Sequence, residues 1–393
     1  MTGRVKVGLE RVLEGAAPDL SGPALGLIVH PASVTRELVR ADHALLSHPD
    51  FDVRALFGPQ HGARGEKQDN MIESESFADA RSRIPVYSLY GDVRKPTEEM
   101  LAGLDVLLFD LQDVGVRIYT FVWTMALAMQ ACREAGVRFV VLDRPNPIGG
   151  ETLEGPLLWP DYASFVGLYP LPIRHGLTTG ELARHLNRAF EIGCDLSVVE
   201  MEGWRRGQWM DETGLPYVMP SPNLPTLDSC AVFPGMVLLE GTNLSEGRGT
   251  TRPFELFGAP YLDPHALADE IDPKVLRGAT LRPCSFEPTF QKHAGTLCGG
   301  AQIHVTNRGE WSSVAFAVEL LRAVRALAPN DFAWRSPPYE YEYEKHPIDI
   351  LWGSPTLRQG IDAGLGADEI LAESDDECRV FAERTLPDLL YEE

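Results

Sequence analysis

The chain has 393 residues, 44% of them hydrophobic and 23% charged, and a formal net charge of −22 at pH 7. That length is enough for two globular domains, each with its own core. Proteins that bind nucleic acid or anionic lipid need a cationic surface, so the net charge argues against both kinds of partner. The amino terminus has no apolar signal-peptide region and no run is long enough to span a membrane, so the sequence predicts a cytoplasmic protein.

Cofactor and metal motifs are missing from the sequence. The six cysteines are scattered without a Cys-x-x-Cys pair, which favours reduced thiols over a zinc site or a disulfide framework. No Walker loop is present, and no Gly-x-Gly-x-x-Gly follows the first apolar run. His30, His61 and His175 are too scattered to indicate a metal, because isolated histidines more often form hydrogen bonds. We therefore expect neither a cofactor nor a metal.

Apolar runs alternate with helical patterns in the first half of the chain. The runs predict strands at 24–34, 53–62, 84–91, 105–115 and 137–147. A helix is predicted at 119–136, where Gly136 suits a C-cap. Continuous Val, Ile and Leu runs separated by helices are typical of a parallel sheet covered on both faces. The sequence therefore predicts an α/β fold with a Rossmann-like, doubly wound, mostly parallel sheet.

The second half of the chain is less regular. A capped helix is predicted at 178–190 and a strand at 195–201, followed by a stretch rich in Gly, Pro, Ser and Asn from 202 to 260. A long irregular stretch is usually functional or a connection between domains. A strand at 301–307 and an amphipathic helix at 311–328 then indicate a smaller α+β domain. We place the two domains at residues 1–228 and 229–393.

Polar side chains follow four of the predicted strands. In an open α/β sheet, ligands bind beyond the carboxyl ends of the strands, and parallel strands bring these ends to one edge. A structural role explains any one of these residues at least as well, but four loops together favour a site for a polar, oxygen-rich ligand such as a sugar. The residues are His30 and Ser33; Gln60, His61, Arg64 and Glu66; Asp110, Gln112, Asp113, Arg117 and Tyr119; and Asp143, Arg144 and Asn146.

A later glycine-rich loop at 240–260 carries a second polar set. It contains Asn243, Glu246 and Arg248, and its glycines allow a tight backbone. The loop is either a surface connector with an internal ion pair or the second wall of a small-molecule pocket between the domains.

Several motifs resemble those of the exo-β-N-acetylmuramidase family, formerly a domain of unknown function. The resemblance extends from about residue 24 to about 305, and its most distinctive motifs are GPQHGARGE, FDLQDVGVRIYT, VLDRPNPIGG, PSPNLPT and LLEGTNLSEGRGTTRPFELFGAP. It implies a glycoside hydrolase that removes β-1,4-linked N-acetylmuramic acid from the non-reducing end of peptidoglycan fragments. It also implies a Rossmann-like domain joined to a smaller carboxy-terminal domain, with the active site in the cleft between them.

The sequence departs from the family at position 60. Members of the family resemble Gly-Pro-Glu-His-Gly there, and the resemblance implies that this glutamate is catalytic, whereas this chain has Gln60. An amide forms hydrogen bonds but does not transfer a proton. Loss of a general acid commonly costs about 10² to 10⁴-fold in rate, so we expect another acid to serve or the chemistry to be altered.

Several carboxylates are candidates for the missing acid. We favour Asp113 and Glu246 as the catalytic pair, with Glu66 as the replacement acid; Asp110 and Glu154 are further carboxylates in the matching motifs. A carboxyl separation of about 5 to 5.5 Å predicts retention at the anomeric carbon, and about 6.5 to 9.5 Å predicts inversion. The 2-acetamido group of the substrate is an alternative nucleophile.

Other roles follow from charge and shape. Arg64, Arg117 and Arg248 are candidates to bind the lactyl carboxylate of muramic acid, because a guanidinium matches a carboxylate in bidentate geometry. We expect His61 and Asn146 to bind hydroxyl groups. Either Tyr119 or Trp123 offers an apolar face to the sugar, although Trp123 on a helix also suits the core.

Three functions therefore remain open. The first is an exo-muramidase that acts on small recycled muropeptides in the cytoplasm. The second is a sugar-binding protein that kept the cleft and lost the acid, and the third is a hydrolase of another glycoside. Each takes a small-molecule substrate or ligand, and none predicts an oligomeric state.

Overall fold

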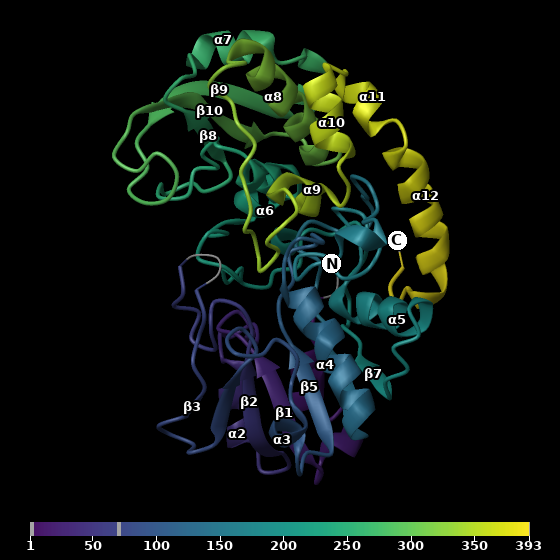
Figure 1. Cartoon of the computed structure of the whole chain (residues 1–393). Helices are drawn as coiled ribbons and strands as arrows, with labels where there is room; N and C mark the ends of the chain where they lie inside the picture. The colour runs from purple at the N-terminus through teal and green to yellow at the C-terminus, as the bar shows by residue number, and fades with distance from the viewer. Residues whose placement is uncertain (1–3, 69–71, 393) are drawn as a thin grey trace.

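The computed structural model describes residues 4–68 and 72–392. Two sheets lie at opposite ends of the molecule, with the N-terminal sheet in the lower part of the view and the C-terminal sheet in the upper part (Figure 1). Loops and short helices from both halves of the chain fill the region between them.

The N-terminal sheet is the larger one. Its strands are β1 (Ala24–Val29), β2 (Asp52–Gly58), β3 (Phe77–Ala78), β4 (Pro85–Ser88), β5 (Val106–Asp110), β6 (Arg138–Leu142) and β7 (Leu196–Val199). The spatial order is β3-β4-β2-β1-β5-β6-β7, and every neighbouring pair is parallel except β3 with β4. The predicted α/β class with a mostly parallel sheet is confirmed. The chain reverses its direction of winding between β1 and β5, which is where such sheets bind ligands.

Helices cover both faces of this sheet. One face carries α1 (Gly8–Leu13) and α2 (Ala41–Ser47), and the other carries α3 (Glu98–Leu101), α4 (Phe121–Ala135) and α5 (Thr179–Ala189). Successive residues of a strand point to opposite faces, so Leu27 packs in the first layer and Ile28 in the second. Helix α4 is apolar nearly all round and confirms the helix predicted at 119–136, with Gly136 as a left-handed C-cap at φ 69°.

The C-terminal part has a smaller antiparallel sheet with the order β8-β10-β9, made of β8 (Leu256–Ala259), β9 (Ala279–Phe286) and β10 (Cys298–Val305). The predicted smaller second domain is therefore confirmed. Its helices are α6 (Leu227–Met236), α7 (Pro264–Glu270), α8 (Ser313–Leu327), α9 (Pro347–Trp352), α10 (Thr356–Ala363), α11 (Ala367–Leu371) and α12 (Ser374–Thr385). The sequence predicted β10 and α8, whereas α6, α7, β8, β9 and α9 to α12 were not predicted.

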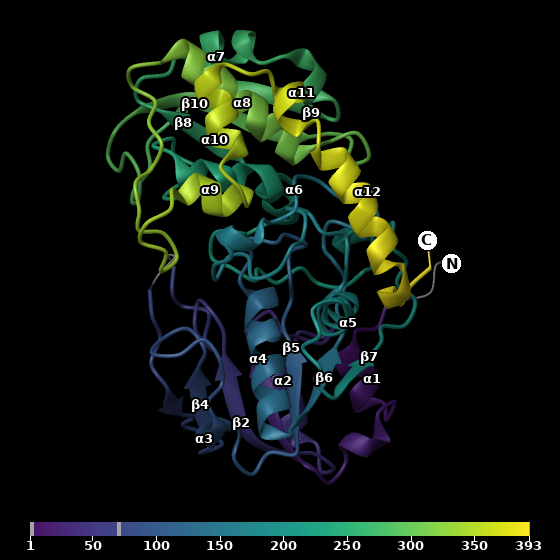
Figure 2. The same cartoon turned by 45° about the vertical axis from the view of Figure 1, so that its right-hand side comes forward.

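Helix α12 joins the C-terminal part back to the N-terminal part. It runs along the outside of the molecule and ends beside α5 in both views (Figures 1 and 2). Just beyond it, Asp388 accepts hydrogen bonds from Arg188 and His185 of α5. The chain then reaches the large sheet again, where the Tyr391 hydroxyl donates to Asp143 after β6.

We expect Tyr391→Phe to lower the free energy of unfolding by about 1–2 kcal/mol. Burial raises the pKa of Asp143 to about 7, and the hydrogen bond from Tyr391 opposes that rise. The loss should therefore be larger at pH 8, where Asp143 is charged, than at pH 6. Urea unfolding at both pH values checks this, with the exposed Tyr343→Phe as the matched control. An equal loss at both pH values would contradict it.

Candidate active site

A cleft lies between the two parts of the molecule, directly at Gln60. It encloses about 400 Å³, including space open to solvent. Its N-terminal wall consists of Gln60, His61, Ile118, Tyr119, Thr120, Val166, Ser221 and Leu224. Its C-terminal wall consists of Phe233, Val237, Glu240, Arg248, Phe254, Tyr339 and Glu340.

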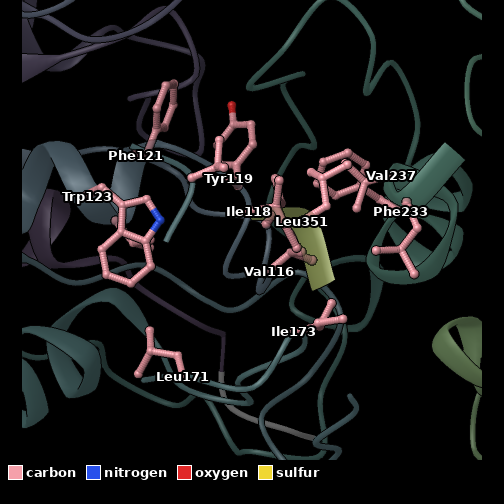
Figure 3. Close-up of a cluster of buried hydrophobic side chains, with 14 of the residues drawn as sticks. Val116, Ile118, Tyr119, Phe121, Trp123, Leu171, Ile173, Phe233, Val237 and Leu351 are labelled. Carbon is pink, nitrogen blue, oxygen red and sulfur yellow. The ribbon is translucent and has the colours of Figure 1, made fainter. Parts of the chain in front are cut away.

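Part of the cleft lining is apolar and belongs to the buried core. Figure 3 shows Ile118, from the loop after β5, close to Leu351 and Val237 of the C-terminal part, with Phe233 nearby. These side chains belong to one buried cluster that continues from the large sheet into the C-terminal part. A continuous core of this kind fixes the two walls relative to each other.

Gln60 stands in the turn that follows β2. Its side-chain oxygen accepts a hydrogen bond from Thr120, and its Nε2 donates to the Tyr90 hydroxyl at 3.2 Å. The Tyr90 hydroxyl in turn donates to Glu340 Oε2 at 2.9 Å. One hydroxyl therefore connects the amide at position 60 to a carboxyl group of the opposite wall.

His61 follows Gln60 and also lines the cleft. Its backbone is left-handed, with φ 71°, and its Nδ1 lies 2.8 Å from the carbonyl oxygen of Lys67. Tyr119 lines the same wall, and its hydroxyl donates to the carbonyl oxygen of Pro220 at 2.7 Å. The structure thus brings Gln60, His61 and Tyr119 together, as the sequence analysis predicted.

Two carboxyl groups of the C-terminal wall have opposite pKa shifts. Burial raises the pKa of Glu240, but the charge of Arg248 and the hydroxyl of Tyr339 outweigh burial, so its pKa lies below the ordinary value. The distances are 2.6 Å to Arg248 and 2.7 Å to Tyr339. Burial raises the pKa of Glu340 to about 7, and the charge of Glu240 adds to that rise. At neutral pH the cleft therefore holds a carboxylate and a carboxyl group that keeps its proton about half of the time.

This pair of carboxyl groups was not predicted from the sequence. Glu240 is the first residue of the glycine-rich loop and belongs to a motif that carries the family resemblance, which was the available signal. Glu340 lies in a tail rich in Tyr, Glu and Pro, where no periodic pattern distinguishes it from its neighbours.

The structure does not bring the predicted acids Glu66, Asp113 and Glu246 together. Glu66 is exposed and lines a separate groove beside β2 and β4, together with Arg64, whose guanidinium stacks on Phe77 at 4.4 Å. The loop turns at Gly62 and Gly65, both at positive φ, and this turn directs Glu66 to the outer groove.

Asp113 and Glu246 are buried, and neither lines the cleft. Asp113 Oδ2 accepts from the Gly115 amide at 2.7 Å and from His175 Nε2 at 3.2 Å. Glu246 pairs with Lys292 at 2.8 Å and with Arg248 at 3.3 Å. Glu246 therefore supports the position of Arg248, which does line the cleft.

Arg117, which we expected to bind substrate, does not line the cleft. Its side chain is completely buried. Its guanidinium donates, at distances between 2.7 and 2.9 Å, to the carbonyl oxygens of Pro156, Leu171, Leu351 and Trp352. Two of these acceptors belong to the C-terminal part, so Arg117 joins the two parts of the molecule.

Most polar side chains at the sheet edge form hydrogen bonds or ion pairs with other groups of the protein. Asp110 and Arg144 form a buried bidentate ion pair with distances of 2.6 and 2.8 Å. Gln112 donates to backbone carbonyls, and Asn146 holds the backbone around residues 148 and 177. Asp143 accepts from Thr178 and the amide of Gly180 at the start of α5.

Two further residues that were predicted to contact the sugar, Asn243 and Trp123, do not line the cleft. Asn243 accepts from Tyr261 and donates to the carbonyl oxygen of Asp331, all within the C-terminal part. Trp123 is buried in α4 and donates to the carbonyl oxygen of Arg117, so of the two predicted aromatic residues only Tyr119 lines the cleft. Within residues 4–68 and 72–392, no three His, Cys, Asp or Glu side chains are grouped for a metal ion. None of the helices in these ranges has the length and apolarity to cross a bilayer.

Comparison with known proteins places both parts of the chain in one family. The models of the N- and C-terminal domains of exo-beta-N-acetylmuramidase NamZ match residues 25–228 and 231–391. Peptidoglycan beta-N-acetylmuramidase NamZ of Bacillus subtilis (strain 168) is 44% identical over 388 residues, which are 99% of this chain and 92% of that protein.

Solved structures agree with this assignment. Two DUF1343 family proteins of Bacteroides fragilis NCTC 9343 superpose with TM-scores of 0.89 and 0.76, at 33% and 27% sequence identity. The first superposition covers 99% of both chains and the second covers 100% of both. The chain therefore belongs to the exo-β-N-acetylmuramidase NamZ family and is a glycosidase.

Proposed function

We propose that this protein removes β-1,4-linked N-acetylmuramic acid from the non-reducing end of peptidoglycan fragments, in the cleft at Gln60. The observation that carries the proposal is that residues from both family segments, from Gln60 to Glu340, line one cleft. The B. subtilis relative is named a peptidoglycan beta-N-acetylmuramidase. Most glycoside hydrolases use a pair of carboxyl groups, and this cleft contains two.

The lining of the cleft supports binding of a terminal sugar. Tyr119 and Phe254 offer apolar faces to a ring, while Gln60 and His61 offer hydrogen bonds. Arg248 lines the cleft and remains our candidate for the lactyl carboxylate, whereas Arg64 and Arg117 lie elsewhere.

Hydrolysis of two chromogenic glycosides tests this function. We expect the native protein to release nitrophenol from 4-nitrophenyl β-N-acetylmuraminide and much less from the glucosaminide, which has no lactyl group. Glu66→Gln tests the groove beside β2 and β4 that Glu66 lines. Loss of activity in that variant would support Glu66 as the catalytic acid and place the chemistry in that groove rather than in the cleft at Gln60. No hydrolysis by either the native protein or Gln60→Glu would contradict the proposal.

Gln60 favours a second candidate function, a sugar-binding protein that no longer hydrolyses its ligand. Its amide cannot donate a proton to a glycosidic oxygen. Hydrolysis by Gln60→Glu alone would support this candidate, as would sugar binding without hydrolysis in both proteins. Hydrolysis of the glucosaminide alone would instead support a different glycoside as substrate.

A further inference from the structure

The geometry points to Glu340 as the general acid of this cleft, in place of the glutamate that the family has at position 60. Glu340 would give its proton to the glycosidic oxygen of the departing group. This inference rests on the proposed glycosidase function and assigns the step that Gln60 cannot perform.

The position of Glu340 is the first argument. Its side chain lines the same cleft as Gln60, and the residue is only 3% exposed. The Tyr90 hydroxyl accepts from Gln60 and donates to Glu340 Oε2, so a single hydroxyl separates the two side chains. A carboxyl group at 340 therefore lies within reach of the region that a glutamate at 60 would serve.

Glu340 also differs from its neighbouring carboxyl groups in having no ion-pair partner within the described part of the chain. The other two carboxylates of this region are paired with cations: Glu240 with Arg248, and Glu246 with Arg248 and Lys292. Among the residues that the structure describes, Glu340 forms no ion pair, and its carboxyl group accepts a hydrogen bond from the neutral Tyr90 hydroxyl. A buried carboxyl group without a directly bonded cation retains its proton more readily.

The backbone at Glu340 is strained. Glu340 and Tyr341 both have left-handed φ angles, of 44° and 68°. Such conformations are unfavourable for residues other than glycine and persist where surrounding contacts enforce them. Here Arg94 stacks on the Tyr341 ring at 3.6 Å, and Tyr339 and Glu342 exchange backbone hydrogen bonds across the turn. The turn thus directs the Glu340 side chain inward at a local energetic cost.

The two carboxyl groups of the C-terminal wall then have different roles: Glu340 donates a proton and Glu240 accepts one. Burial raises the pKa of Glu340 to about 7, while Arg248 and Tyr339 keep Glu240 ionised. The Glu340 proton passes to the glycosidic oxygen, and the bond from that oxygen to C1 breaks with its electron pair remaining on the oxygen. Water forms the new bond to C1 and gives a proton to the Glu240 carboxylate. Exchange with solvent returns both groups to their starting states, so the net reaction consumes one water.

Glu340→Gln tests the assignment with two substrates. A leaving group as acidic as nitrophenol needs little protonation, whereas a sugar hydroxyl needs it fully. We expect turnover of N-acetylmuramyl-β-1,4-N-acetylglucosamine to fall by about 10² to 10⁴-fold, and turnover of the nitrophenyl substrate to fall by less than about tenfold. An equal loss on both substrates, or no loss on either, would overturn the role of Glu340.

The dependence of kcat/KM on pH gives a second readout. A general acid must be protonated, so the native activity should decline above pH about 7, and Glu340→Gln should lose that decline. Tyr90 acts as a positioning residue: its hydrogen bond lowers the pKa of Glu340, so Tyr90→Phe should move the decline to higher pH. If kcat/KM declines at the same pH in both variants as in the native protein, the inference is overturned. The Tyr90→Phe measurement tests the inference even if Glu340→Gln fails to fold.

Rescue and a matched control complete the design. Glu344→Gln removes an exposed glutamate four residues away and should leave both activities unchanged. Adding Gln60→Glu to Glu340→Gln restores an acid at the family's position and should recover part of the disaccharide activity. Native activity with an unaffected Glu340→Gln variant would sink the inference and leave the function intact. Absence of activity in the native, Gln60→Glu and double-variant proteins would sink the function itself.

Discussion

Arg117→Met is expected to lower the free energy of unfolding by about 3–5 kcal/mol. The substitution would leave four buried carbonyl oxygens without their donor, and two of them lie in the C-terminal part of the chain. Burial lowers the pKa of Arg117 to about 9, so the guanidinium is still charged at pH 7 and its hydrogen bonds are charge-assisted.

Urea unfolding at pH 7 measures the effect. Because Arg117 joins the two parts of the molecule, we also expect the transition to become less cooperative, with the C-terminal part unfolding first. Arg379→Met is the matched control, since Arg379 is exposed on α12 and, within the described ranges 4–68 and 72–392, pairs only with Asp376 of the same helix. Its effect should stay within about 0.5 kcal/mol. A loss below about 1 kcal/mol in Arg117→Met would contradict the bridging role.

Glu340→Gln is expected to raise the free energy of unfolding at pH 8 by about 1–3 kcal/mol, while it lowers activity. The pKa of Glu340 is about 7 in the folded protein and close to the ordinary value of 4.5 in the unfolded chain. Between these values the folded state binds more protons than the unfolded state, so the native protein loses stability as pH rises from about 4.5 to about 7. Glutamine does not titrate, so the variant lacks this loss.

Denaturant unfolding at pH 4.5, 6 and 8 checks the direction. The native protein and Glu340→Gln should have similar stabilities at pH 4.5 and diverge as pH rises. Glu344→Gln, which changes an exposed side chain, should follow the native protein at every pH. Parallel pH profiles for the native protein and Glu340→Gln would show that Glu340 does not carry the buried, unpaired charge.

The sequence predicted the N-terminal sheet because burial on both faces produces a recognisable pattern. Strands β1 and β5 are apolar at nearly every position, α4 ends at the glycine C-cap Gly136, and α5 begins with a capping box at Thr178. Strand ends were predicted too far along the chain: the run at 105–115 ends as a strand at Asp110, because the residues after it turn into the loop. In the C-terminal part, β9 alternates between half-buried and exposed residues, and this weak contrast left it unrecognised.

The candidate site was predicted in part, for a different physical reason. Residue types at the sheet edge indicate polar chemistry, but they do not reveal which side chains satisfy one another. Asp110 and Arg144 neutralise each other, whereas Gln60 and His61 remain at the cleft. The opposite wall depends on how the C-terminal part folds back. No spacing rule brings a residue at 240 next to one at 340, so Glu240 and Glu340 became visible only in the structure.

The structure of the Glu340→Gln protein with bound N-acetylmuramyl-β-1,4-N-acetylglucosamine tests the location of the chemistry most directly. We expect the muramyl ring to lie between Tyr119 and Arg248, with the glycosidic oxygen within about 3.2 Å of the new amide at 340. Density for the disaccharide in the outer groove beside Glu66, with the Gln60 cleft unoccupied, would contradict the account.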